Sequence, residues 1–304
     1  MCAQQDYWCA DGTYVCGVKA LLSIVPYNVT FTEGRTIAME LKRLGQTEVM
    51  IPEIGLGAWK YRGGTEPLRR GVELGAFLID TAEIYGTEDV VGQAIDDIRE
   101  QVFLASKVSG QHLRYDEVMR AAENSLRRLN VDCIDLYQVH WPNTQVPIRE
   151  TMRAMEALVD IGQVKYIGVS NFSAVELRDA QAVMEHHPIV SNQVLYNLNR
   201  RQIERDLLPY CQEQNITVIA YTPLDDGRLA RRQRLSRRNG TKALEQIAAE
   251  VDKSMAQVAL NWCTARSNVI AIPKSDRIER VTENCRASGW RLTPDQMQRL
   301  NVAF

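Results

Sequence analysis

The sequence lacks an apolar run long enough to cross a membrane. Its longest candidate, residues 18–29, is interrupted by Lys19, Ser23, Pro26 and Asn28, whereas a spanning helix needs about 20 apolar residues. The N-terminal stretch up to Cys16 contains no Lys or Arg, so it also lacks the basic start of a secretory signal. We therefore expect a cytoplasmic protein that has no membrane partner.

Strong charge patterning and ligand-like cysteine spacing are missing as well. The 304 residues carry 36 Lys and Arg against 38 Asp and Glu, a net charge of -2, which gives no electrostatic reason to bind nucleic acid. The seven cysteines show neither CxxC nor Cys/His spacing, so we expect no metal site. Four of them lie among apolar residues, where we expect them to be buried: Cys133, Cys211, Cys263 and Cys285.

The N-terminal part of the chain lacks a clear periodicity. Residues 1–38 mix residue types irregularly, and a regular alternating pattern begins only at Met39. We expect residues 1–38 to be a poorly ordered extension or a start-site artefact, and residues 39–304 to form one domain. At its start, residues 41–44 and 49–51 flank a short turn, which predicts a β-hairpin.

Short apolar runs then alternate with amphipathic segments, the pattern of successive βα units with a parallel sheet. The expected strands are 54–56, 77–79, 102–105, 133–139, 164–169, 189–194, 217–220 and 269–272. The expected helices are 66–74, 88–98, 115–129, 148–161, 174–184, 202–214, 242–265 and 277–285, with a break near Lys253. Such a repeat over about 250 residues predicts an α/β fold, a (β/α)8 TIM barrel.

A doubly wound α/β sheet is the alternative fold. It requires a glycine-rich phosphate-binding loop after the first strand. Gly55 and Gly57 are present, but Lys60 stands where the third glycine is needed. We therefore prefer the barrel.

Polar residues stand just after three neighbouring strands of the expected barrel. Asp80 and Tyr85 follow the second strand, Lys107 the third and His140 the fourth. Because the carboxyl ends of barrel strands meet at one face, we expect these side chains to lie close together. A cation held by a carboxylate is the simplest means of lowering a tyrosine pKa from about 10.

Six motifs in the chain resemble those of the aldo-keto reductase family, in the family's order and at compatible spacings. They are GLGAWK at 55–60, DTAEIYG at 80–86, SK at 106–107, VHWP at 139–142, GVSNF at 168–172 and IPKS at 272–275. The resemblance covers residues 39–304 and is closest to the short microbial members. It implies a nicotinamide-dependent enzyme that reduces an aldehyde or ketone to an alcohol.

The resemblance also implies roles for the four strand-end residues. Tyr85 would be the general acid, Lys107 would lower its pKa, Asp80 would hold Lys107, and His140 would orient the substrate carbonyl. The chemistry agrees, because negative charge grows on the carbonyl oxygen as hydride arrives, and a phenol and an imidazole can hydrogen-bond it. Tyr85 would act as the base in the reverse reaction.

Residues after the fifth, sixth and seventh strands resemble the family's nicotinamide site. Ser170, Asn171 and Gln193 have side chains able to bind a carboxamide through paired donors and acceptors. The resemblance implies that Tyr221 stacks on the nicotinamide ring and that Leu224 belongs to the same cofactor site.

The residues after the eighth strand resemble the family's adenosine phosphate and adenine site. They are Lys274, Ser275, Arg280, Glu283 and Asn284. A Lys, an Arg and a hydroxyl suit a phosphate dianion and would be idle against a bare hydroxyl, so we expect NADPH, with NADH less favoured.

Trp59 and Trp141 lie on loops expected to line the mouth of the pocket, where they would bind an apolar or aromatic carbonyl compound. Only 24 residues follow Arg280, too few for a long C-terminal substrate loop, so we expect an open, permissive pocket. We expect a small-molecule carbonyl partner and a monomer or weak homo-oligomer.

The remaining expectations concern an arginine-rich loop and two alternative functions. An arginine-rich loop at 228–238 is interpreted as a solvated charge run rather than a diphosphate site. A non-catalytic, nicotinamide-cofactor-sensing or regulatory subunit on the same fold remains an alternative. A glycosidase using Asp80 and Glu83 is disfavoured because both acids come from one loop, and Glu83 receives no role.

Overall fold

The structure is a computed structural model and describes residues 39–231 and 239–304. The expectation for residues 1–38 therefore lies outside the described residues, as do Arg232, Arg234, Arg237 and Arg238 of the arginine-rich loop. None of the described helices is both long enough and apolar enough to cross a bilayer.

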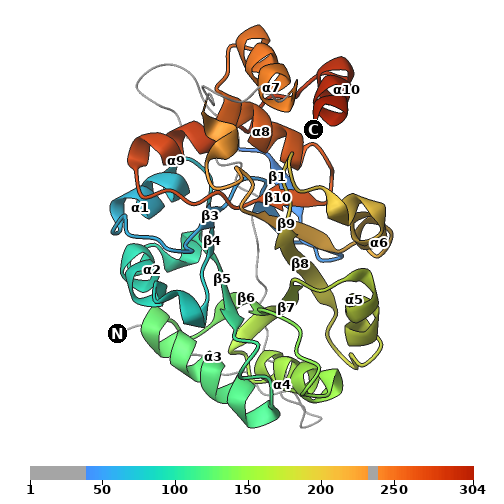
Figure 1. Cartoon of the computed structure of the whole chain (residues 1–304). Helices are drawn as coiled ribbons and strands as arrows, with labels where there is room; N and C mark the ends of the chain where they lie inside the picture. Colours follow the sequence, from blue (N-terminus) through green and yellow to red (C-terminus); the bar gives the residue numbers. More distant parts are fainter. Residues whose placement is uncertain (1–38, 232–238) are drawn as a thin grey trace, which may run out of the picture.

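Parallel strands form a closed ring at the centre of the molecule (Figure 1). They are β3 Leu56–Gly57, β4 Leu78–Asp80, β5 Phe103–Val108, β6 Ile134–Val139, β7 Val164–Ser170, β8 Ile189–Leu195, β9 Thr217–Tyr221 and β10 Val269–Ala271. Each strand pairs with the next along the chain, and a parallel bridge between Ile54 and Ala271 joins the two edges. The N–H of Gly55 donates to the carbonyl of Ala271 at 2.8 Å. The expected barrel is confirmed.

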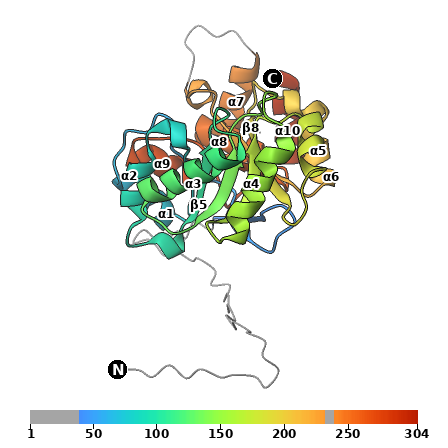
Figure 2. The ribbon, with the colours of Figure 1, turned by 90° about the horizontal axis from the view of Figure 1, so that it is seen from below.

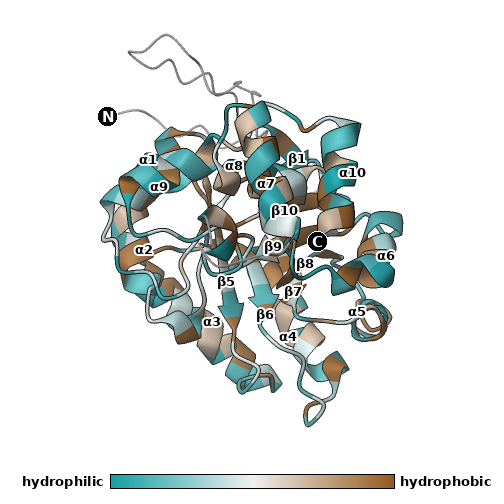
Figure 3. Cartoon of the chain, turned by 45° about the horizontal axis from the view of Figure 1, so that its top comes forward, coloured by the Kyte–Doolittle hydropathy of each residue, from teal (hydrophilic) through white to brown (hydrophobic). Residues whose placement is uncertain are grey.

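Helices form the outer layer around this ring. They are α1 Glu66–Glu73, α2 Glu88–Ile95, α3 Tyr115–Leu129, α4 Ile148–Asp160, α5 Ala174–Gln181, α6 Leu207–Glu213, α7 Asn239–Glu250, α8 Met255–Thr264, α9 Ile278–Cys285 and α10 Pro294–Ala303. Seen from below, α3 and α4 lie in front of β5 (Figure 2). The outer helices carry both hydrophilic and hydrophobic residues (Figure 3), and α3 buries Val118, Ala122 and Leu126 among others. Amphipathic periodicity therefore predicted α1 to α9 near their observed positions, although α6 begins at Leu207 rather than at residue 202.

The break expected near Lys253 separates α7 from α8. The Ser254 hydroxyl accepts a hydrogen bond from the N–H of Gln257 at 3.2 Å and so caps α8. Helix α10 was not predicted, although Thr293, Pro294 and Gln296 form a capping box with a proline in the first turn. That pattern is an N-terminal helix signal, so the sequence did contain the information.

The cysteines largely follow the expectation. Cys211, Cys263 and Cys285 are buried, whereas Cys133 is only half-buried. Cys133 precedes β6 rather than lying within it, so it stands at the rim of the barrel.

The predicted hairpin is present and closes the end of the barrel where the strands begin. It consists of β1 Leu41–Arg43 and β2 Met50–Pro52, which pair antiparallel. Leu44 and Ile51 are fully buried and share one apolar cluster with Leu78, Phe103 and Val190 at the starts of their strands. The open end of the barrel is therefore the one where the strands finish.

A buried ionic cluster ties this closed end to the C-terminal part of the chain. Glu53 is fully buried and accepts hydrogen bonds from Ser288 Oγ at 2.6 Å and from Arg291 Nη1 and Nη2 at 3.0 and 2.8 Å. Lys42 Nζ lies 3.7 Å from the same carboxylate. Burial lowers the pKa of Lys42 to about 8, although Glu53 opposes the shift. The cluster is stable only while each charge keeps its partner.

We expect Glu53→Ala to lower the free energy of unfolding by about 3 to 5 kcal/mol, because it removes the buried counter-charge of Lys42 and one of the two carboxylates paired with Arg291. Urea denaturation measures the change. The control is Glu48→Ala, which removes a largely exposed carboxylate 2.5 Å from Arg43 and should leave stability nearly unchanged. Equal losses in the two variants would contradict the importance of burial.

Candidate active site

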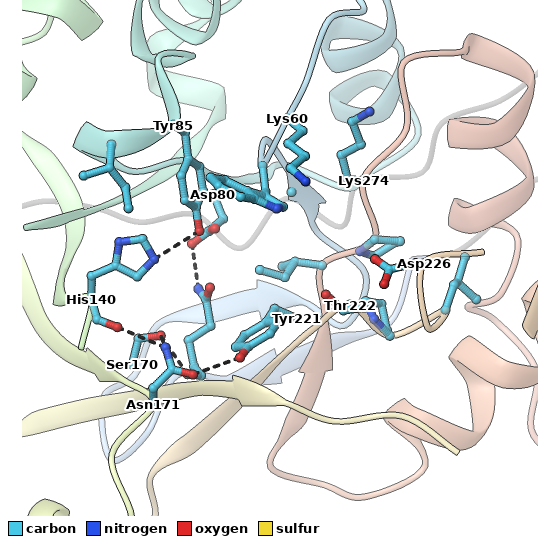
Figure 4. A pocket seen from close by; sticks show the side chains of 18 of the residues that line it. Lys60, Asp80, Tyr85, His140, Ser170, Asn171, Tyr221, Thr222, Asp226 and Lys274 are labelled. Atoms are coloured by element: carbon cyan, nitrogen blue, oxygen red, sulfur yellow. Dashed lines mark hydrogen bonds between the residues drawn. The ribbon is translucent and has the colours of Figure 1, made fainter. Parts of the chain in front are cut away.

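A cavity of about 650 Å³ opens where the barrel strands finish, a volume in the range of small-molecule sites. Its lining includes Asp80, His140, Ser170, Gln193 and Tyr221, each at or just after the end of a different strand. Residues far apart in the sequence are thus gathered at one face, as the barrel predicted (Figure 4).

Asp80, which lines the cavity, forms an ion pair with Lys107, which lies outside the lining. Lys107 is fully buried, and its Nζ donates to Asp80 Oδ2 at 2.6 Å and to the carbonyl of Thr81 at 2.7 Å. The other Asp80 oxygen accepts a hydrogen bond from Gln193 Nε2 at 2.7 Å. Burial lowers the pKa of Lys107, and Asp80 opposes that shift. The expected Asp80–Lys107 contact is therefore present.

Tyr85 and His140 point toward one another across the cavity (Figure 4). The phenol oxygen lies 3.4 Å from His140 Nε2, and the two rings meet edge-on with centroids 5.4 Å apart. Burial and the Lys107 ammonium lower the pKa of His140 to about 3. The imidazole is therefore neutral near pH 7, and one small oxygen atom can reach both groups.

The sequence predicted that Lys107 lowers the pKa of Tyr85, but in the structure this pKa is raised. Burial raises the pKa of Tyr85, and the Asp80 carboxylate adds to the rise. Lys107 lies 4.8 Å from the centre of the Tyr85 ring, but its charge is already compensated by Asp80. The phenol consequently stays protonated, which is the state that a proton donor requires.

The predicted carboxamide-binding residues form one hydrogen-bonded chain. Tyr221 donates through its hydroxyl to Asn171 Oδ1 at 2.9 Å, and Asn171 Nδ2 donates to Ser170 Oγ and to the carbonyl of His140, both at 3.0 Å. The Ser170 hydroxyl donates to the carbonyl of Gln193 at 2.8 Å. These contacts fix the Asn171 amide in one orientation beside the catalytic candidates.

The predicted phosphate and adenine residues are only partly gathered at the cavity. Lys274 lines it and forms an ion pair with Asp276, and Leu224, which was predicted in another part of the cofactor site, also lines it. Ser275, Arg280, Glu283 and Asn284 lie outside the lining, on or just before α9. Arg280 Nη1 contacts Glu283 Oε2 at 2.5 Å, so its guanidinium is held on the helix surface.

Nine lining residues were not predicted as site residues, among them Lys60, Ile84 and Asp226. Lys60 adopts a left-handed backbone with φ of 54° at the end of the first motif, and Asp226 has φ of 53° in the loop after β9. Ile84 is 54% exposed beside Tyr85. The sequence could have indicated Ile84, because it is an apolar residue next to the candidate acid Tyr85. Nothing in the sequence indicated Asp226.

The predicted mouth residues are in place. Trp59 and Trp141 are 49% and 51% exposed and both line the cavity. The Trp59 ring lies 4.8 Å from that of Tyr85, tilted by 59°. Together with Ile84 they give the entrance an apolar rim.

The glycosidase alternative receives no support. Asp80 is occupied by Lys107 and Gln193, and Glu83 lies outside the cavity lining, where it contacts Ser109 and His112. Asp80 and Glu83 therefore do not face one substrate as a glycosidase pair would. Within 39–231 and 239–304, no cluster of three potential metal ligands occurs.

Comparisons with known proteins agree with this geometry. The profile of the Aldo/keto reductase family matches residues 53–303. The chain is 40% identical to methylglyoxal reductase YeaE of Escherichia coli K12, covering 84% of this chain and 92% of that protein. It is 35% identical to glyoxal reductase of Bacillus subtilis 168, with 84% and 89% covered.

Solved structures give the same result. An aldo/keto reductase from Klebsiella pneumoniae, in complex with NADP and acetate, is 36% identical and superposes with a TM-score of 0.80. The match covers 87% of this chain and 95% of that one.

We expect His140 to remain neutral between pH 5 and 8, because its pKa of about 3 lies far below that range. Ring-nitrogen chemical shifts in an NMR titration should then be flat for His140. Lys107→Met removes the neighbouring cation, so the pKa of His140 should rise. Protonation of His140 in the unmodified protein within this pH range would contradict the assignment.

Proposed function

The chain belongs to the aldo/keto reductase family, and from this premise we propose that residues 39–304 reduce an aldehyde or ketone with NADPH, using Tyr85 as the general acid. The observation that carries the proposal is the 3.4 Å separation of the Tyr85 hydroxyl and His140 Nε2 at the cavity, above a buried ion pair. The reaction is reversible, with Tyr85 as the base in alcohol oxidation.

His140 and Tyr85 hold the carbonyl oxygen of the substrate in this proposal. The neutral imidazole donates one hydrogen bond through Nε2 when that nitrogen carries the proton, and the phenol donates the other. NADPH, when bound, would supply the hydride. As negative charge develops on the oxygen, the Tyr85 proton moves to it, so the protonated phenol of the resting site is the competent form.

Lys107 acts on the phenolate that remains after proton transfer. Its ammonium lies 4.8 Å from the ring of Tyr85, and a cation at this distance favours the charged form in a buried site. Asp80 keeps Lys107 charged and in place. In this proposal Lys107 therefore opposes the rise in the Tyr85 pKa that burial and the Asp80 carboxylate cause.

The described residues fit a nicotinamide cofactor. Tyr221 presents a ring beside the Asn171 amide, which suits a flat ring that carries a carboxamide. At the other end of the cavity Lys274 offers a cation, and Ser275 and Arg280 lie next along the chain. The structures similar to this chain include one with NADP and one with NADPH. We infer that NADPH is preferred over NADH.

We infer the substrate class from the residues at the mouth of the cavity and from the names of two related reductases. The exposed, apolar rim of Trp59, Ile84 and Trp141 accepts compounds of several sizes. Two relatives are named for the reduction of methylglyoxal and glyoxal. We propose that small dicarbonyl aldehydes and aromatic aldehydes are both reduced.

Mixing the protein with NADPH and methylglyoxal, or with an aromatic aldehyde, should give a steady loss of nicotinamide absorbance. In Tyr85→Phe the rate constant kcat should fall by roughly 100-fold or more, because the proton donor is lost. Tight NADPH binding without turnover of any carbonyl would favour the cofactor-sensing alternative. Full activity in Tyr85→Phe would contradict the mechanism.

We expect Lys274→Met to raise the KM for NADPH by about tenfold and to change the KM for NADH much less, because only NADPH carries the extra phosphate. Steady-state kinetics with both cofactors measures the ratio. Lys165→Met is the matched control, since Lys165 pairs with Asp135 at 2.7 Å outside the cavity lining. An unchanged NADPH preference in Lys274→Met would refute this role.

A further inference from the structure

Glu83 lies two residues before Tyr85, and the proposed reaction leaves it without a role. It begins the short 3-10 helix Glu83–Tyr85, and its side chain is only 9% exposed. Its Oε1 accepts the backbone N–H of Ser109. His112 Nδ1 lies 3.1 and 3.3 Å from the two carboxylate oxygens and donates to them, because a carboxylate can only accept. We call these three residues the Glu83 bridge.

The Glu83 bridge holds the loop that follows β5. Ser109 comes directly after that strand, two residues beyond Lys107. The loop also reaches the segment after β6: the carbonyl of Gly110 accepts a hydrogen bond from Asn143 Nδ2 at 2.8 Å. A Cβ at Gly110 would come within 3.2 Å of the Trp141 carbonyl. One loop is thus tied to the Tyr85 segment on one side and closely packed on the other.

The two tied segments carry the two groups that would contact the carbonyl oxygen. Glu83 anchors the segment of Tyr85, whereas Trp141 and Asn143 follow His140 directly. The N–H of His140 also donates to the carbonyl of Val108 at 2.9 Å, so the β5 end is the common support of both. The Glu83 bridge joins the Tyr85 segment to the same end of β5.

We propose that Glu83 is a positioning residue that sets the separation of Tyr85 and His140 through the loop after β5. The inference rests on the proposed carbonyl reduction, in which both groups bind one oxygen atom. Their present separation is 3.4 Å, and a displacement of about 1 Å costs roughly 100-fold in rate in well-organised sites. Glu83 therefore acts through Tyr85 and touches no substrate.

The mouth of the cavity depends on the same bridge. Ile84, 54% exposed, stands between Glu83 and Tyr85, and Trp141, 51% exposed, packs beside Gly110. Both side chains line the cavity and belong to its apolar rim. Loss of the bridge should therefore also raise the KM for bulky aldehydes more than for small ones.

The first test removes both hydrogen bonds with Glu83→Ala. We expect kcat for aldehyde reduction to fall about tenfold or more. The Kd for NADPH, followed by fluorescence, should stay within about twofold, because Glu83 lies outside the cavity lining. In Glu83→Gln the amide oxygen still accepts from Ser109 and the amide N–H can donate to a neutral His112. Its kcat should therefore return to within about threefold of wild type.

Glu117→Ala is the matched control. Glu117 Oε2 accepts the backbone N–H of Arg114 at 3.2 Å, at the other end of the same loop, and should leave kcat unchanged. Equal losses in Glu83→Ala and Glu117→Ala would show general loosening of the loop and overturn the positioning role.

Hydrogen exchange provides a readout that does not need turnover. The amide of Ser109 should exchange faster in Glu83→Ala than in wild type, and unchanged exchange would overturn the bridge itself. If wild type reduces no carbonyl, the proposed function fails and this inference with it. If wild type is active and Glu83→Ala keeps its kcat, the inference alone fails. Should Glu83→Ala not fold, His112→Ala decides: a lower kcat at unchanged Kd for NADPH supports the role, and an unchanged kcat overturns it.

Discussion

The buried ion pair of Asp80 and Lys107 is the constraint on which the site depends. A fully buried ammonium is costly unless a counter-charge and further acceptors surround it. Here Asp80 comes from β4, Lys107 from the neighbouring β5, and Gln193 reaches Asp80 from β8 at 2.7 Å. Only a closed barrel brings β4, β5 and β8 close enough together for these contacts. The ion pair is therefore a consequence of the fold, and its Asp80 side chain lines the cavity.

The two ends of the barrel separate stability from function. At the end where the strands begin, the hairpin and the Glu53–Arg291 cluster exclude water and join distant parts of the chain. At the other end, Trp59 and Trp141 remain half-exposed around a cavity. Leaving these two tryptophan side chains exposed to water costs hydrophobic free energy. The apolar packing at the closed end must offset that cost.

In the proposed reaction, the resting site donates a proton to a carbonyl. Burial keeps Tyr85 protonated, and the same burial with Lys107 keeps His140 neutral. The two groups are therefore both able to hydrogen-bond an oxygen that is gaining negative charge. The pKa of Tyr85 is raised because burial and the Asp80 carboxylate disfavour the phenolate, and in the proposed reaction Lys107 stabilises the phenolate against both.

The order of apolar and amphipathic segments was sufficient to predict the barrel, and the polar residues at the strand ends sufficed to predict a site containing Asp80, Tyr85, Lys107 and His140. Their gathering follows from topology, because parallel barrel strands all finish at one face. Tertiary structure alone decided the direction of the Tyr85 pKa change, since it depends on burial and on the nearby Asp80 carboxylate. It also decided the partners of Glu83, because Ser109 and His112 are brought to it by the neighbouring strand and not by any spacing that the sequence displays.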